Sequence, residues 1–137
     1  MHPLRQLRET SVPTYEAIAA ILAEDVVFNS PLLVRPIAGR DAVARTLVQS
    51  STTRGSPGEY VLECKIDANT TLLRWKGTID GHPLESLELL VDDANGLLVE
   101  RTIAFRPFPA LRIFRDRMKA SLGDSLGVGM WDYEPEA

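Results

Sequence analysis

The spacing of apolar residues changes once along the chain, from a helical period in the first half to a strand period in the second. In the first half, apolar residues three, four and seven positions apart predict amphipathic helices over 13–23 and 41–49. Two turns of an earlier helix are predicted over 4–11, and a short strand over 26–28. Residues 50–58, with the sequence SSTTRGSPG, are predicted as a loop.

From residue 60 onward apolar and polar side chains alternate, which is typical of strands that bury one face. The alternation and the turn residues between the runs predict four consecutive strands, at 60–66, 73–79, 84–91 and 97–106. Prolines then begin a last helix that ends near Gly123, and an acidic tail follows over 124–137. Helices followed by a run of antiparallel strands indicate the α+β class, with helices packed on one face of a curved sheet.

The composition restricts the class of protein. The chain has 137 residues, of which 45% are hydrophobic and 25% charged, and a net charge of −4, values typical of one soluble globular domain spanning 1–137. No apolar run is long enough for a membrane span, and the N-terminal residues show no signal peptide, so we expect a cytoplasmic protein with no membrane partner. The single cysteine, Cys64, lies in an apolar strand and is expected in the core.

Metal and nucleic-acid binding are not expected. Two distant histidines and one cysteine give no metal-ligand spacing, and nothing in the chain indicates a cofactor. The most basic stretch, residues 106–119, is interrupted by Asp116 and belongs to an acidic chain, so a solvated helix face is expected rather than a nucleic-acid surface. Trp131 and Tyr133 are expected to fold back onto the body or a partner subunit, since free tails rarely carry two large aromatic residues.

Three strings of the sequence resemble a known superfamily. They are LAEDVVFNSP at 22–31, GRDAV at 39–43, and NGLLVE at 95–100 followed by Arg106-Pro107. With the order of elements, they resemble the nuclear-transport-factor-2-like (NTF2-like), or cystatin-like α+β-barrel, superfamily in its SnoaL-like and ketosteroid-isomerase-like branch. The resemblance implies a single NTF2-like domain in which N-terminal helices pack in the concave face of a strongly curved antiparallel sheet, forming a cone-shaped α+β barrel with a C-terminal helix.

The resemblance also implies a small-molecule pocket in the open end of the cone and dimerisation through the outer face of the sheet. In the register that it implies, the residues expected to contact a ligand are Ser30, Leu73, Trp75, Ile79, Ser86, Leu90, Ile103 and Phe105. Leu87, Leu89 and Val91 then point outward, where a homodimer would bury them.

Glu88 and Arg101 are the candidate catalytic residues, because this register places both among apolar neighbours on the cavity side. A buried charge is tolerated when an opposite charge pairs with it, and one tight hairpin joins the two strands, so the two side chains are expected to meet. An opposite charge favours the ionised carboxylate, which suits a general base or an anchor for a polar group of the substrate. The structural alternative is a cross-strand ion pair that only closes the cone.

The catalytic sets of two related enzyme families are incomplete in this chain. The general base of the ketosteroid isomerases is an Asp before the proline that ends the first short strand, and Ser30 stands at that position. The Tyr of their oxyanion hole is also missing, although Glu88 stands where they have a protonated acid, so ketosteroid isomerase activity is not expected. In place of the Arg-x-Asp motif of the related epoxide hydrolases the chain has Arg74-x-Lys76, and in place of their last-strand Asp it has Ile103.

Two functions are compatible with these residues. The first is a cofactor-independent isomerase, cyclase or dehydratase of a small apolar ring compound, with Glu88 as the acid or base and Arg101 setting its charge. The SnoaL-like cyclases need only one such acid or base. The second is a non-catalytic dimeric protein that binds a ligand or a partner, in which the same two residues are structural.

Overall fold

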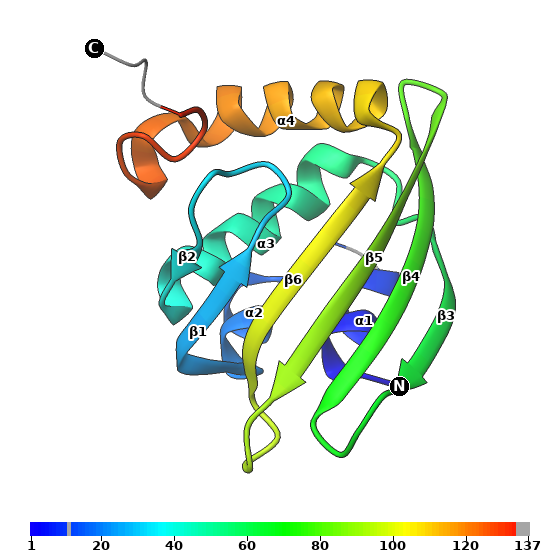
Figure 1. Cartoon of the computed structure of the whole chain (residues 1–137), viewed down its shortest axis with the longest axis vertical. Helices are drawn as coiled ribbons and strands as arrows, with labels where there is room; N and C mark the ends of the chain where they lie inside the picture. The colour runs from blue at the N-terminus through cyan, green and yellow to red at the C-terminus, as the bar shows by residue number, and fades with distance from the viewer. Residues whose placement is uncertain (11, 134–137) are drawn as a thin grey trace.

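The computed structural model describes residues 1–10 and 12–133, so the last four residues of the acidic tail lie outside the described chain. The helices are α1 (Pro3–Thr10), α2 (Tyr15–Ala20), α3 (Arg40–Arg54) and α4 (Phe108–Leu122), followed by a short 3₁₀ helix, η1 (Gly123–Leu126). The strands are β1 (Leu22–Asn29), β2 (Ile37–Ala38), β3 (Glu59–Lys65), β4 (Thr70–Ile79), β5 (His82–Asp92) and β6 (Leu98–Arg106). The predicted helices and strands are all present, and β2 is added to them (Figure 1).

One six-stranded sheet forms the framework, in the order β2-β1-β6-β5-β4-β3. The strands from β3 to β6 form the predicted antiparallel meander, and the predicted α+β class is confirmed. In one respect the sheet differs from the expected antiparallel barrel, because β1 runs parallel to β6. In the described chain the two edge strands, β2 and β3, do not pair with each other, so the sheet is mixed and open.

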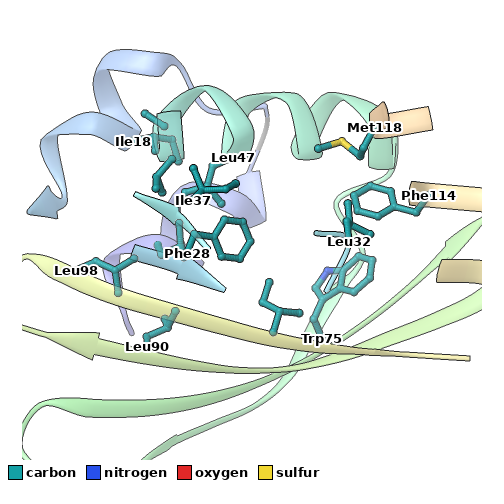
Figure 2. Packing of buried hydrophobic residues seen from close by; sticks show 14 of the residues in the cluster. Ile18, Phe28, Leu32, Ile37, Leu47, Trp75, Leu90, Leu98, Phe114 and Met118 are labelled. Atoms are coloured by element: carbon teal, nitrogen blue, oxygen red, sulfur yellow. The ribbon is translucent and has the colours of Figure 1, made fainter. Parts of the chain in front are cut away.

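The helices cover one face of this sheet. Figure 1 shows α1, α2 and α3 behind the sheet and α4 across its upper end. Buried and exposed residues alternate along β4, β5 and β6, so these strands turn every second side chain toward the helices. Leu90 and Leu98 on the sheet belong to one apolar cluster with Ile18 and Leu47 on the helices (Figure 2). The core therefore lies between the concave face and the helices.

The predicted loop at 50–58 is wrong in its first half, because α3 continues to Arg54. Two of the polar residues there satisfy their hydroxyl groups within the helix: Ser50 donates to the Leu47 carbonyl at 3.1 Å and Thr52 to the Val48 carbonyl at 3.2 Å. The helix ends at Gly55, whose φ of +78° is readily adopted only by glycine. The extra turn carries Arg54 to the interior.

The predicted helix over 13–23 ends early, at Ala20, and β1 is correspondingly longer than the predicted strand at 26–28. The apolar residues at the junction fit a helical and a strand spacing equally well. The strand is formed here because β1 pairs with β6, with Leu22 opposite Leu98.

The prediction that Cys64 is a core residue is also wrong, because Cys64 is exposed. The register between β3 and β4 shifts between Tyr60 and Leu62, which marks a β-bulge around Val61. Tyr60 lies opposite the buried Trp75, but beyond the bulge the alternation is inverted, and Leu62 and Cys64 lie on the outer face.

The tail folds back in part. Trp131 is buried, as expected, whereas Tyr133 is 84% exposed and does not pack on the body. Packing of Tyr133 on a partner subunit stays a prediction. Asp132 pairs with Arg115 and Lys119 of α4 at 2.7 and 3.1 Å. The acidic tail thus neutralises part of the basic helix face.

Two glycines make room for the indole ring of Trp75. A Cβ atom at Gly58 or at Gly77 would overlap this ring. The ring is fixed because its Nε1 atom donates a hydrogen bond to the carbonyl of Pro57 at 2.8 Å. The position of Trp75 therefore depends on two small neighbours, one just before β3 and one on β4.

Gly77→Ala is expected to destabilise the fold by about 1–3 kcal/mol, because the added methyl group has to displace the ring of Trp75. Thr78→Ala, at the next and exposed position of β4, is the matched control, with an expected change below about 0.5 kcal/mol. Urea unfolding followed by circular dichroism measures both variants. Equal stability of the two would show that the ring is not confined.

Candidate functional site

A cavity lies between the inner face of the sheet and the helices. Its volume is about 40 Å³. A buried water needs about 10–15 Å³, so the cavity has room for about three water molecules. Its walls are mostly apolar, and its charged groups come from α1, α3, β5 and β6. The half-exposed residues Ser30, Pro31 and Phe105 mark its mouth.

Aromatic rings form much of the wall. Trp75 and Phe105 lie edge to face with their centroids 6.3 Å apart, and Phe105 and Phe114 lie 5.9 Å apart with a tilt of 48°. Figure 2 shows Phe28, Trp75 and Phe114 between the sheet and the helices. Such a wall suits a flat apolar molecule.

Glu88 of β5 and Arg101 of β6 meet at this cavity. Glu88 lies opposite Ile103 and Arg101 lies opposite Leu90, so the ion pair is diagonal across the two strands. The Nη2 atom of Arg101 donates to Oε2 of Glu88 at 3.1 Å. Each side chain is only 3% exposed.

Both members of this pair keep an unused polar atom. Oε1 of Glu88 and Nε of Arg101 are buried and have no hydrogen-bond partner among residues 1–10 and 12–133. The guanidinium of Arg101 lies over the ring of Phe28, 4.7 Å from its centroid. Burial lowers the pKa of Arg101, and the adjacent Glu88 carboxylate opposes that shift. The pair can therefore accept further hydrogen bonds from a ligand and donate to it.

Two more arginines line the cavity, and neither was expected from the sequence. Arg8 of α1 is 5% exposed and donates from Nη1 to Oγ of Ser50 at 3.1 Å. Arg54, at the end of α3, stacks on Trp75 with its Cζ atom 5.1 Å from the ring centroid. Burial, and next the charge of Arg8, lower the pKa of Arg54 to about 10.

A signal for Arg8 was present in the sequence. Arg8 follows Leu4 by four positions, so the two share one face of α1, and Leu4 is fully buried. Arg54 had no such signal, because it stands among polar residues with no apolar spacing.

The structure brings most of the predicted ligand-contacting residues to the cavity. These are Ser30, Trp75, Ser86, Ile103 and Phe105, together with Glu88 and Arg101. Leu73, Ile79 and Leu90 are buried in the apolar core and do not line the cavity. The strand period places them on the inner face of the sheet, but other core side chains pack against them and close them off from the cavity.

The part of the chain that the structure describes contains no group of three His, Cys, Asp or Glu side chains placed to hold a metal ion. None of the described helices combines the length and the apolar character that crossing a bilayer requires. His82 is exposed in its turn, as expected.

No family model matches the sequence, and a comparison with curated proteins finds no match. Solved structures do match. An uncharacterized protein with a cystatin-like fold from Silicibacter pomeroyi DSS-3 is 25% identical, with a TM-score of 0.79 over 91% of this chain and 89% of the other. A steroid delta-isomerase from Pseudomonas aeruginosa is 22% identical, with a TM-score of 0.73 over 91% and 88%. An NTF2-like protein of unknown function from Cytophaga hutchinsonii is 16% identical, with a TM-score of 0.59 over 80% and 88%.

The chain therefore has the cystatin-like, or NTF2-like, α+β fold, and the resemblance inferred from the sequence is confirmed. At these identities the similarity shows the fold. The activity has to be argued from the site, because one fold carries many functions.

The buried pair is expected to be sensitive to the loss of one charge. Glu88→Gln is expected to lower the free energy of unfolding by about 3–5 kcal/mol, because it leaves Arg101 buried without a carboxylate. Glu85→Gln, on the same strand, is the matched control. Its carboxylate pairs with two arginines near the surface, so the expected change is about 1 kcal/mol or less. Urea unfolding compares the two variants, and similar effects would contradict a stabilising role of the buried pair.

Proposed function

We propose that this protein binds a small organic ring compound in the cavity and moves a proton on it without a cofactor, with Glu88 as the acid or base. The reaction class is an isomerisation, cyclisation or dehydration through an enol-like intermediate. The observation that carries the proposal is the buried Oε1 atom of Glu88, which has no hydrogen-bond partner in the described chain while Arg101 holds Oε2. A steroid delta-isomerase among the similar structures is consistent with this class.

The arrangement of Glu88 suits proton transfer. A carboxylate that acts as a base needs a fixed orientation and one oxygen within reach of the proton. Arg101 fixes the orientation by binding one oxygen, and the other oxygen is free to meet a C–H or O–H group of the ligand. The apolar wall limits water around Glu88, so the electrostatic interactions inside the cavity are stronger than in solvent.

The charges around Glu88 suit the intermediate. Removal of a proton beside a carbonyl group places negative charge on the carbonyl oxygen. Three guanidinium groups, of Arg8, Arg54 and Arg101, line the same cavity, and buried positive charge stabilises such an oxygen. Glu88 takes the proton and returns it to another atom of the ligand, so the reaction is redox-neutral and uses no co-reactant.

Binding of a ring compound requires the cavity to open, because about 40 Å³ is less than such a compound occupies. Phe105 is the half-exposed ring at the mouth, and it packs on Trp75 and Phe114 only through ring edges and tilted contacts. We expect a ligand to displace Phe105 while β5 and β6 keep the ion pair in place.

Deuterium exchange tests the proposal without knowledge of the product. A panel of cyclic ketones and cyclic keto acids is incubated with the protein in D₂O, and loss of the C–H signal beside the carbonyl is followed by NMR. We expect exchange of at least one compound, and a rate about a hundredfold lower in Glu88→Asp, whose carboxylate is set back by one methylene group. Glu85→Asp, on the same strand, is expected to keep the full rate.

The aspartate variant keeps the negative charge beside Arg101, so its folding can be verified by circular dichroism before exchange is compared. Binding of panel members without exchange would contradict the catalytic role. It would favour the second function, a non-catalytic ligand-binding protein, which one observation supports: Glu88 and Arg101 bind each other, as a purely structural pair does.

We also propose that the protein is a homodimer joined through the outer face of the sheet. Leu87 and Leu89 are 50% and 40% exposed on β5, which is an inner strand of the sheet, and Val91 is partly buried. A second copy of the chain on this face would remove these side chains from water.

Leu87→Lys is expected to convert the dimer to a monomer, because it replaces an exposed apolar side chain of the proposed interface with a charge, next to Arg74 of β4. Phe108→Lys changes an apolar residue of α4 that is 70% exposed and is expected to leave the dimer intact. Size-exclusion chromatography with light scattering reports the mass of each variant. A monomeric wild-type protein at micromolar concentration would contradict the proposed interface.

A further inference from the structure

The cavity contains more positive charge than its own carboxylate neutralises. Arg8, Arg54 and Arg101 line it, and Glu88 is the one acidic side chain in its described lining. Glu88 pairs with Arg101, whereas Arg8 and Arg54 form no ion pair with any carboxylate of residues 1–10 and 12–133. Two positive charges are therefore left over at neutral pH.

Each of these arginines also keeps one unused donor, although one Nη atom of each donates a hydrogen bond within the chain. The Nε atoms of Arg8, Arg54 and Arg101 are buried, and within the described residues none of the three has a hydrogen-bond partner. A buried polar group normally has a partner, because leaving it unpaired costs about 1–3 kcal/mol. Three such donors at one cavity indicate that their partner comes from outside the described residues.

The guanidinium groups lie close enough to disturb one another. Burial, and next the charge of Arg8, lower the pKa of Arg54 to about 10, and Arg8 also adds to the lowering of the Arg101 pKa by burial. Arg54 is nevertheless protonated at neutral pH, and its buried charge therefore destabilises the folded protein at every pH below about 10. An anion in the cavity would remove this penalty.

We infer that the ligand of this cavity is an anion, a carboxylate carried on a flat apolar ring, and that Arg8 and Arg54 bind the carboxylate while Arg101 holds Glu88. This inference rests on the ligand cavity of the proposed function and names its substrate class as a cyclic carboxylic acid. A guanidinium stacked on an aromatic ring, as Arg54 is on Trp75, presents its N–H groups around its edge. A planar carboxylate that lies beside the guanidinium, in the same plane, accepts two parallel N–H hydrogen bonds from it.

The count of charges favours a carboxylate over a phosphate. A singly charged carboxylate leaves one excess positive charge at the cavity, and that charge is available to the enol-like oxygen of the intermediate. A doubly charged phosphate neutralises both excess charges and leaves none. The aromatic wall of Trp75, Phe105 and Phe114 then takes the apolar ring of the ligand.

Matched acids and amides test this inference. Benzoate is compared with benzamide, and 2-naphthoate with 2-naphthamide, by titration calorimetry at neutral pH and constant ionic strength. The members of each pair have nearly the same shape and differ in charge. We expect at least one acid to bind about tenfold or more tightly than its amide, which is the effect of one charge-assisted hydrogen bond.

Three variants assign the effect to the cavity. Arg54→Gln is expected to reduce the affinity for the acid about tenfold and to leave the affinity for the amide unchanged. Arg54→Lys keeps the charge but not the paired donors, and an intermediate affinity is expected. Arg112→Gln removes an exposed arginine of α4 and is the control that changes neither affinity.

The melting temperature without ligand separates binding from folding. Arg54→Gln removes an unpaired charge, so its melting temperature is expected to equal or exceed that of the wild type. A purely structural arginine would instead lower the melting temperature when replaced. The benzoate-induced rise of the wild-type melting temperature is expected to be lost in this variant.

Several results would overturn the inference. They are equal affinity for acid and amide, no binding of either acid, and a preference for the acid that survives in Arg54→Gln. Inorganic phosphate that binds more tightly than either acid would overturn the choice of a carboxylate. These results differ from a failure of the proposed proton transfer, which is judged separately by deuterium exchange of the panel of cyclic ketones and keto acids in the wild type and Glu88→Asp.

Discussion

The buried ion pair of Glu88 and Arg101 is the constraint on which the rest of the structure depends. Each side chain is 3% exposed, and a charge so far from water strongly destabilises the fold unless an opposite charge lies beside it. The two residues meet because one hairpin joins β5 and β6 and turns both side chains toward the helices. An apolar cavity can in this way hold a carboxylate with one oxygen fixed and the other free.

The helices add charge to this pair instead of neutralising it. α1 brings Arg8 to the cavity, and the last turn of α3 brings Arg54 onto the ring of Trp75. Buried like charges repel, so these two arginines do not contribute to stability through their charge. Groups that oppose folding and converge on one cavity are typical of sites that recognise a ligand.

The same fold places its chemistry differently from what the resemblance to ketosteroid isomerases implies. Ser30 does lie at the cavity, at the position where those enzymes carry their base, but a hydroxyl cannot take that role. The carboxylate of this chain comes from β5 instead, and its neighbour is a guanidinium rather than a tyrosine. In the proposed function, the shared framework fixes where a ligand binds, and the individual side chains decide what is done to it.

The sequence by itself determined the α+β class, the four-strand meander and the inner face of β4, β5 and β6, because an alternating period is a property of consecutive residues. It also singled out Glu88 and Arg101, since charged residues that interrupt an apolar strand face are visible in the chain itself. The bulge in β3, the parallel pairing of β1 with β6 and the extra turn of α3 depend on contacts between distant segments, so no local pattern shows them. For the same reason only the tertiary structure decided that Arg8 and Arg54 share one cavity with Glu88. The excess of positive charge arises because α1, α3, β5 and β6 all contribute a charged side chain to this cavity.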